Sequence, residues 1–207
     1  YLAANLSSRK NLNNHLIKNL KPVGVPSNLK NTVFSFEYNN IESLKKILNK
    51  HNIGIIKMEV KREDDPKKNF LQQVRKIADK KNILLIFDEC TSGFRKTFGG
   101  LHKHYKVKPD MAMFGKALGN GYAITAIIGR RAVMEAAQST FISSTFWTER
   151  IGPTAALKTL EVMERERSWE QVTSIGLQLR SRWQELADRH GLRITHNGLP
   201  ALAGFSI

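Results

Sequence analysis

The chain has 207 residues, of which 41% are hydrophobic and 25% charged, and its 33 Lys+Arg against 18 Asp+Glu give a net charge of +15. This is the composition of an ordinary globular protein, so it excludes a disordered, collagen-like or disulfide-stapled chain. The single cysteine, Cys90, cannot form a disulfide within the chain, and no apolar run reaches the roughly 18 residues needed to cross a bilayer. We therefore expect a cytoplasmic protein without a membrane segment.

The positive charge first suggests a nucleic acid or another anionic partner. Residues 1–110 carry +12 of the +15. Their lysines fall on the polar sides of segments with helical apolar spacing, and the aromatic residues that would stack on bases are not interleaved with them. We interpret these lysines as solvated helix surfaces and expect no nucleic-acid partner, with a basic module for anionic ligands as the alternative.

The first half of the chain predicts a strand–helix–strand unit. Residues 1–36 are irregular apart from a short apolar stretch at 33–36. The apolar spacing that follows predicts a helix capped by Asn40, a buried strand at 53–60 and a helix that includes residues 70–78. Residues 82–90, NILLIFDEC, have the pattern of a central parallel strand covered on both faces.

The second half predicts two more short strands and two helices. The strands are residues 111–114 and 123–129, separated by GKALGNGY. A helix follows Gly152, and a longer one runs from about residue 169 to residue 190 and stops at Gly191. The tail, residues 192–207, has the pattern of an opening strand of another domain. The fold class is therefore α/β, a mostly parallel sheet with flanking helices.

Two charged residues follow strands at the edge where an α/β sheet binds its ligands. Asp88 ends an apolar strand, and a carboxylate there needs a cationic partner unless it serves as a cap or a structural ion pair. Lys116 follows the strand MAMF and is one of only two lysines after residue 110. A desolvated lysine forms Schiff bases with carbonyl groups, although an ordinary strand-end lysine is an open alternative.

Other candidate sites are weaker. The GK pair is not a phosphate-binding loop, because Asp110 stands where that motif requires glycine. His102 and His104 have no third ligand at a recognisable spacing, so we expect no metal and a solvated basic loop. Cys90 is interpreted as core filling rather than a nucleophile. The hydroxyl residues between 143 and 148 suit either a phosphate or simple helix capping.

Four segments together carry a resemblance to a known family. They are FDECTSGFR, PDMAMFGKALGNGYAI, STFWTERIGPTAALKTLEVM and GLPAL. This ordered set resembles the class III aminotransferases of pyridoxal phosphate fold type I, in particular the glutamate-1-semialdehyde aminomutase-like branch. The resemblance implies that residues 1–167 are part of the cofactor-binding large domain, and that residues 168–207 are a connecting helix and the beginning of a small C-terminal α+β domain. It also implies an internal fragment of a longer subunit.

The resemblance also implies roles for individual residues. Asp88 would pair with the pyridinium nitrogen of pyridoxal phosphate, and Lys116 would hold the cofactor as a Schiff base and later move the substrate's Cα proton. Thr145 would bind the cofactor phosphate of the neighbouring subunit, which makes a homodimer the working unit. Glu59 occupies the family's Met-Glu-Pro strand end, with Val60 in place of proline. Thr91 stands where many relatives have a glutamine near the cofactor hydroxyl.

The expected function is transamination or an aminomutase reaction on an amino acid or amino-carbonyl substrate, with a small molecule as amino donor or acceptor. A catalytically inactive fragment, or a racemase or decarboxylase on the same scaffold, are the alternatives that these residues leave open.

Overall fold

A computed structural model describes residues 26, 28, 31–61, 63–143, 145–146 and 148–207. These residues belong to two compact units, which divide between Ile53 and Gly54. In the first unit, α2 (Ile41–Lys50) begins as predicted, because the side chain of Asn40 accepts a hydrogen bond from the Ser43 amide at 3.1 Å. The apolar stretch at 33–36 forms no strand, and the expectations for residues 1–25 lie outside the described residues.

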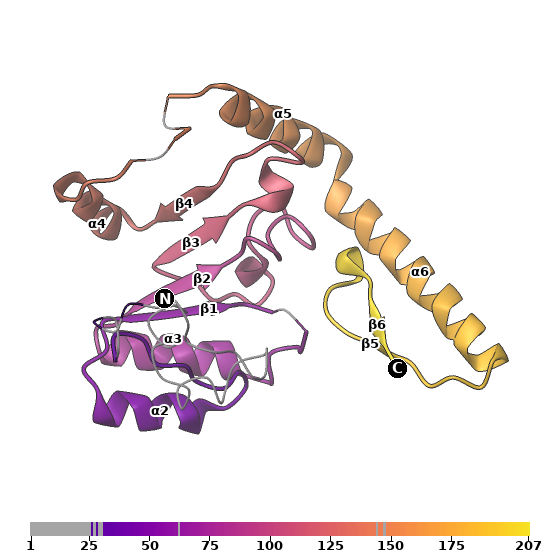
Figure 1. The fold of residues 1–207 in the computed structure, drawn as a ribbon, viewed down its shortest axis with the longest axis horizontal. Helices are drawn as coiled ribbons and strands as arrows, with labels where there is room; N and C mark the ends of the chain where they lie inside the picture. Colours follow the sequence, from indigo (N-terminus) through magenta and orange to yellow (C-terminus); the bar gives the residue numbers. More distant parts are fainter. Residues whose placement is uncertain (1–25, 27, 29–30, 62, 144, 147) are drawn as a thin grey trace. The chain divides into compact units, whose positions relative to one another are not determined.

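The second unit is built on a four-stranded sheet in the order β1-β2-β3-β4 (Figure 1). Its strands are β1 (Ile55–Glu59), β2 (Leu84–Asp88), β3 (Met111–Phe114) and β4 (Ala126–Gly129). The first three are parallel, and β4 is antiparallel to β3. α3 (Phe70–Lys80) connects β1 to β2, which confirms the predicted strand–helix–strand unit.

The two faces of β2 differ in burial. Leu85 and Phe87 are fully buried, as are Leu71 and Val74 on α3. The alternate residues of β2, among them Ile86 and Asp88, are only half buried. The strand is central and parallel as predicted, but within the described part of the chain it is not covered equally on both faces.

The buried side of β3 and β4 packs against α5 (Ile151–Glu166). Ala112, Phe114 and Leu118 form a core cluster with Ala156 of α5. β4 begins three residues later than the sequence predicted, because β3 ends at Phe114, whose register partner is Ala126. Residues 123–125 therefore have no strand opposite them.

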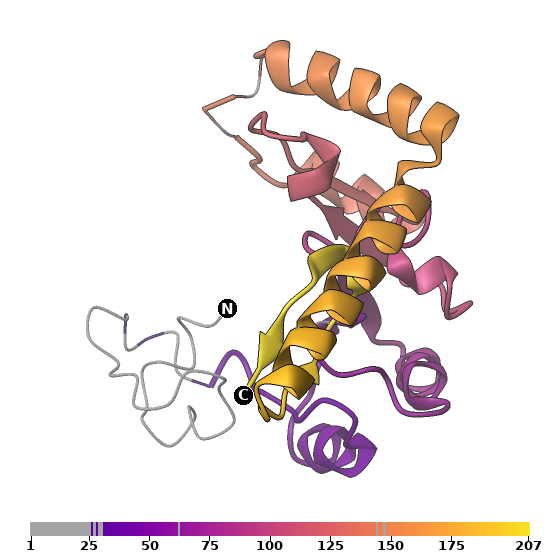
Figure 2. The same cartoon turned by 90° about the vertical axis from the view of Figure 1, so that its right-hand side faces the viewer.

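The helical end of the chain follows the prediction closely. Arg167, with a left-handed φ of 49°, separates α5 from α6 (Ser168–Arg189). The tail forms two short antiparallel strands, β5 (Thr195–His196) and β6 (Phe205–Ser206), rather than one opening strand. Figures 1 and 2 show this pair beside α6. Whether a domain boundary lies at residue 167 stays a prediction.

Arg180 and Gly176 of α6 contact the backbone of the tail. The Arg180 guanidinium donates to the carbonyls of Gly198 and Leu199 at 3.2 and 3.1 Å. Gly176 lies so close to the Pro200 carbonyl that a β-carbon there would overlap it. The remaining short helices are η3 (Leu101–Lys103), η4 (Lys116–Leu118), α4 (Arg131–Met134), η5 (Glu135–Ser139) and η6 (Pro200–Leu202). None of the helices in the described ranges is both long and apolar enough to cross a membrane.

Candidate functional site

Asp88 ends β2 at the carboxyl edge of the parallel strands. The sequence predicted that it needs a cationic partner, and the structure shows that this partner is Lys57. The Lys57 Nζ lies 2.7 Å from Oδ2 of Asp88, and the two side chains are only 19% and 21% exposed. Oδ1 accepts a hydrogen bond from the Cys90 amide at 3.2 Å. The sequence analysis missed Lys57, although alternation along β1 and the pairing of Glu59 with Asp88 place it on the same face.

These contacts decide the charge of Asp88. Burial alone would raise the pKa of the carboxyl group, but the Lys57 ammonium and the Cys90 amide outweigh burial and hold its pKa below the ordinary value of 3.8. Asp88 is therefore a carboxylate at neutral pH. It presents a fixed negative charge at the edge where α/β sheets bind their ligands.

Lys116 lies just after β3, at the same edge. Its backbone is left-handed, with φ of 45°, and its Nζ donates a hydrogen bond to Oγ1 of Thr91 at 2.7 Å. The sequence analysis expected a desolvated amine, but the side chain is exposed in this chain. The structure thus brings Lys116 and Thr91 together, with the hydroxyl orienting the amine.

Cys90 follows Asp88 by two residues and contacts it through its amide. Burial raises the pKa of its thiol, the Asp88 carboxylate raises it further, and Lys116 and Lys57 act weakly in the opposite direction. A thiol with a raised pKa stays protonated at neutral pH, so it is a poor nucleophile. Asp88 contacts the Cys90 amide and Lys116 contacts the Thr91 hydroxyl, so these four neighbouring residues form one charged cluster.

Glu59 and Thr145 have different positions relative to this cluster. Glu59 ends β1 and is the register partner of Asp88. Thr145 is exposed in the segment before α5, and it has no hydrogen bond to Asp88 or Lys116 in the described part of the chain. The start of α5 is capped by Glu149, which accepts hydrogen bonds from the Ile151 and Gly152 amides. Simple capping therefore does not explain the hydroxyl groups that the structure describes there.

The loop after Asp88 is fixed by Glu89, which the sequence analysis did not single out. Its fully buried carboxylate accepts hydrogen bonds from the Leu101 and His102 amides, both at 2.9 Å, and from the Ser92 hydroxyl at 2.5 Å. It also lies 2.8 Å from Nδ1 of His102. The expectation of a solvated His102 is therefore wrong, because the ring is only 16% exposed. Within the described ranges no group of His, Cys, Asp and Glu could hold a metal ion.

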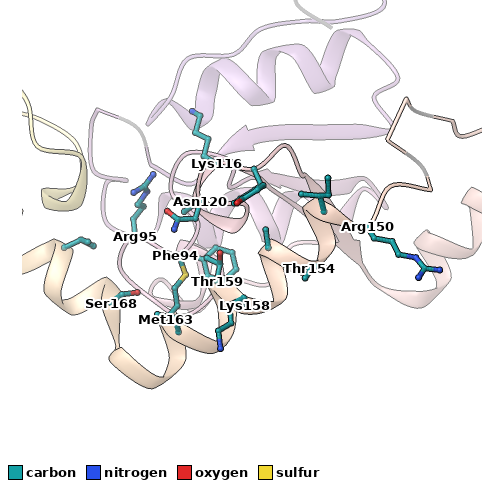
Figure 3. A pocket seen from close by; sticks show the side chains of 17 residues that line it. Phe94, Arg95, Lys116, Asn120, Arg150, Thr154, Lys158, Thr159, Met163 and Ser168 are labelled. Atoms are coloured by element: carbon teal, nitrogen blue, oxygen red, sulfur yellow. The ribbon is translucent and has the colours of Figure 1, made fainter.

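A cavity of about 1060 Å³ is lined by Lys116, by the turn that follows it and by α5. Arg95, Arg150 and Lys158 give its lining a positive charge. In Figure 3 the Lys116 side chain points away from Thr154, Lys158 and Met163. The Lys116 amine therefore faces Thr91 rather than α5, and the cavity lies beside the charged cluster rather than around it.

Comparison with known proteins identifies the family. The sequence model of the class III aminotransferases matches residues 64–199. The chain is 38% identical over 186 residues to a 3-aminobutyryl-CoA aminotransferase of Cloacimonas acidaminovorans, covering 86% of this chain and 45% of that protein. It is 30% identical over 198 residues to a glutamate-1-semialdehyde 2,1-aminomutase of Natranaerobius thermophilus, covering 87% of this chain and 44% of that protein.

Solved structures agree with this. The FumI protein of Sphingopyxis sp. MTA144, in its PLP internal aldimine form, matches with a TM-score of 0.84 and 25% identity over 88% of this chain and 46% of that one. An omega-transaminase from Sphaerobacter thermophilus matches with a TM-score of 0.77 and 23% identity over 86% of this chain and 43% of that one, which supports the fold alone. The chain spans less than half the length of these proteins. Its mixed sheet and flanking helices are those of the pyridoxal phosphate transferase fold of type I, and the chain belongs to the class III aminotransferase family.

Proposed function

We propose that this protein is a pyridoxal phosphate-dependent transaminase or aminomutase that acts on an amino acid or amino-carbonyl substrate. One observation carries the proposal. In a chain of the class III family, a carboxylate and a lysine amine contact consecutive loop residues beyond β2: Asp88 accepts the Cys90 amide, and Lys116 donates to Thr91.

The residues present fit the cofactor. Among the residues that the structure describes, the Cys90 amide is the one backbone donor to Oδ1 of Asp88, and the second lone pair of Oδ1 can accept a donor such as a protonated ring nitrogen. The Lys116 amine has no acidic partner within the described ranges, and its one hydrogen bond there is to a neutral hydroxyl. When bound, pyridoxal phosphate supplies a protonated ring that accepts electrons from the substrate's Cα.

Each residue then has a defined task. Asp88 would keep a negative charge against the ring nitrogen, and Lys116 would hold the cofactor through Nζ. The same amine, when it is not bonded to the cofactor, would take the proton from the substrate's Cα and carry it at Nζ. Thr91 orients that amine through the 2.7 Å hydrogen bond. Glu59, the register partner of Asp88, contributes a second carboxylate to the same edge.

We further propose a cytoplasmic homodimer in which Thr145 binds the phosphate of the cofactor held by the neighbouring subunit. The support is the exposure of Thr145 and its lack of a hydrogen bond to Asp88 or Lys116 in the residues that the structure describes. A cytoplasmic location is in keeping with a free cysteine as the sole cysteine of the chain.

The central assignment is tested by trapping the cofactor. The protein is incubated with pyridoxal phosphate, reduced with borohydride and digested, and the labelled peptide is mapped by mass spectrometry. We expect the label on Lys116 and its loss in Lys116→Arg, whereas Lys158→Arg, the matched change at the other lysine after residue 110, keeps it. A label on another residue overturns the assignment.

A further inference from the structure

The Lys57–Asp88 ion pair has no part in the roles given above. Lys57 stands on β1 and reaches Asp88 on the neighbouring strand, with an Nζ to Oδ2 distance of 2.7 Å. About four fifths of each side chain is buried. Ion pairs on an open surface contribute little, but a charge in this degree of burial depends strongly on its partner.

The two oxygens of the Asp88 carboxylate have different partners. Oδ2 accepts a hydrogen bond from Lys57, whereas Oδ1 accepts one from the Cys90 amide and, like any carboxylate oxygen, has a second lone pair for another donor. The titratable groups around Asp88 are Lys57 and Glu59 on β1, the Cys90 thiol beyond the end of β2, and Lys116 beyond the end of β3. Of the two cations, only Lys57 is bonded to the carboxylate.

We propose that Lys57 is a positioning residue that keeps Asp88 ionised and makes the ring nitrogen of the bound cofactor less basic than Asp88 alone would make it. This inference rests on the proposed function, since it takes the ring nitrogen to face Asp88.

The physical reason is that one carboxylate serves two cations. Before the cofactor binds, Lys57 and the Cys90 amide together offset the cost of burying the Asp88 charge. Once a protonated ring nitrogen faces Oδ1, Lys57 remains nearby as a like charge. A like charge on the other oxygen of the same carboxylate lowers the pKa of the ring nitrogen, by on the order of one unit. Lys57 thus limits how far Asp88 raises the pKa of the ring nitrogen.

The test uses Lys57→Met and Lys57→Gln, which remove the charge, and Lys57→Arg, which keeps it. Lys61→Met is the matched control, because Lys61 forms a similar pair with Asp65, at 2.6 Å. The first readout is the pKa of Asp88 in cofactor-free protein, from ¹³C NMR of labelled carboxyl groups. The second is the pKa of the ring nitrogen, from ¹⁵N NMR of protein loaded with ¹⁵N-labelled pyridoxal phosphate.

We expect both pKa values to rise by about one unit or more in Lys57→Met and Lys57→Gln, and to stay near the wild-type values in Lys57→Arg and Lys61→Met. A lysine with a purely structural role would leave the ring nitrogen unchanged. An unchanged Asp88 pKa in a folded charge-removing variant overturns the first half of the inference, and an unchanged ring-nitrogen pKa overturns the second. If Lys57→Met does not fold, Lys57→Gln, which retains a hydrogen-bond donor for Oδ2, decides.

Failure of the proposed function has a different signature. If borohydride trapping places the cofactor away from Lys116, the proposed function fails, and the ring-nitrogen half of this inference fails with it. The titration of Asp88 in cofactor-free protein still decides whether Lys57 controls its ionisation.

Discussion

At the scale of single residues, the charge of Asp88 is the most consequential property of the site. Asp88→Asn keeps the size of the side chain and removes the charge that would face the ring nitrogen. Fixed charges of this kind are worth about 10²- to 10³-fold in rate. We expect kcat to fall by that order, while borohydride trapping still labels Lys116. Asp65→Asn, which also removes an aspartate bonded to a lysine, is the control. A near-normal kcat in Asp88→Asn contradicts the role.

Asp110 is another buried carboxylate that its partners keep ionised, but away from the candidate site. Its side chain is 6% exposed and contacts Arg75 at 2.9 Å and Arg130 at 2.7 Å, and it accepts the Leu85 amide at 2.7 Å. Burial opposes ionisation, but the Leu85 amide and Arg75 together hold its pKa below the ordinary 3.8. The stabilisation is therefore complete above about pH 4 and is lost as the pH falls through the folded-state pKa.

Asp110→Asn should lower the free energy of unfolding at pH 7 by about 3 kcal/mol, because the part-buried Arg75 then keeps only the exposed Asp79 as a counter-charge. Denaturant titrations between pH 7 and pH 3 provide the measurement. The variant should also show a flatter loss of stability with acid than the wild type. Equal slopes for the two proteins would contradict this account of Asp110.

At the scale of elements, Gly176 governs how α6 holds the C-terminal tail. Alanine normally stabilises a helix interior relative to glycine by up to about 1 kcal/mol. Here the added β-carbon would overlap the Pro200 carbonyl, so Gly176→Ala should destabilise instead, by about 1–3 kcal/mol. The comparison is with Ser174→Ala at an exposed position of α6. Hydrogen exchange at residues 195–206 is the local measurement, and unchanged protection there would contradict the prediction.

The sequence predicted the elements well because their signals are local. Asn40 marks the start of α2, Gly191 follows the end of α6, and the apolar spacing within each segment marks the helix itself. The apolar run before Asp88 marks a central strand. The Lys57–Asp88 pair depends instead on strand register, which joins residues 31 positions apart. The buried bond between Glu89 and His102 depends on how a loop folds back. The apolar periodicity of one segment does not predict contacts between distant segments. Asp88 was therefore predicted as a site residue, whereas its partner Lys57 was not.

At the scale of the whole molecule, the proposed homodimer makes a prediction about mixed subunits. If Thr145 serves the neighbouring subunit's cofactor, a dimer of one Lys116→Ala subunit and one Thr145→Ala subunit has one intact site. In that site the Lys116 of one chain meets the Thr145 of the other. We expect activity to reappear when the two inactive or impaired proteins are mixed and allowed to exchange subunits.

The measurement is activity against the fraction of mixed dimers, quantified by tagging one subunit. Mixing Lys116→Ala with Thr148→Ala, a nearby hydroxyl change, tests whether Thr145 itself is needed. If Thr145 acts within its own subunit, mixing Lys116→Ala with Thr145→Ala gives no recovery.

The left-handed backbone of Lys116 has a consequence for the evolution of the protein. A residue with a β-carbon at φ of 45° costs about 1–2 kcal/mol relative to glycine, which adopts this conformation freely. Lys116→Gly should therefore raise the melting temperature in cofactor-free protein while removing the amine, and a calorimetric scan would show it. If Lys116 holds the cofactor as proposed, selection has kept an amine at a position where glycine would give the more stable protein.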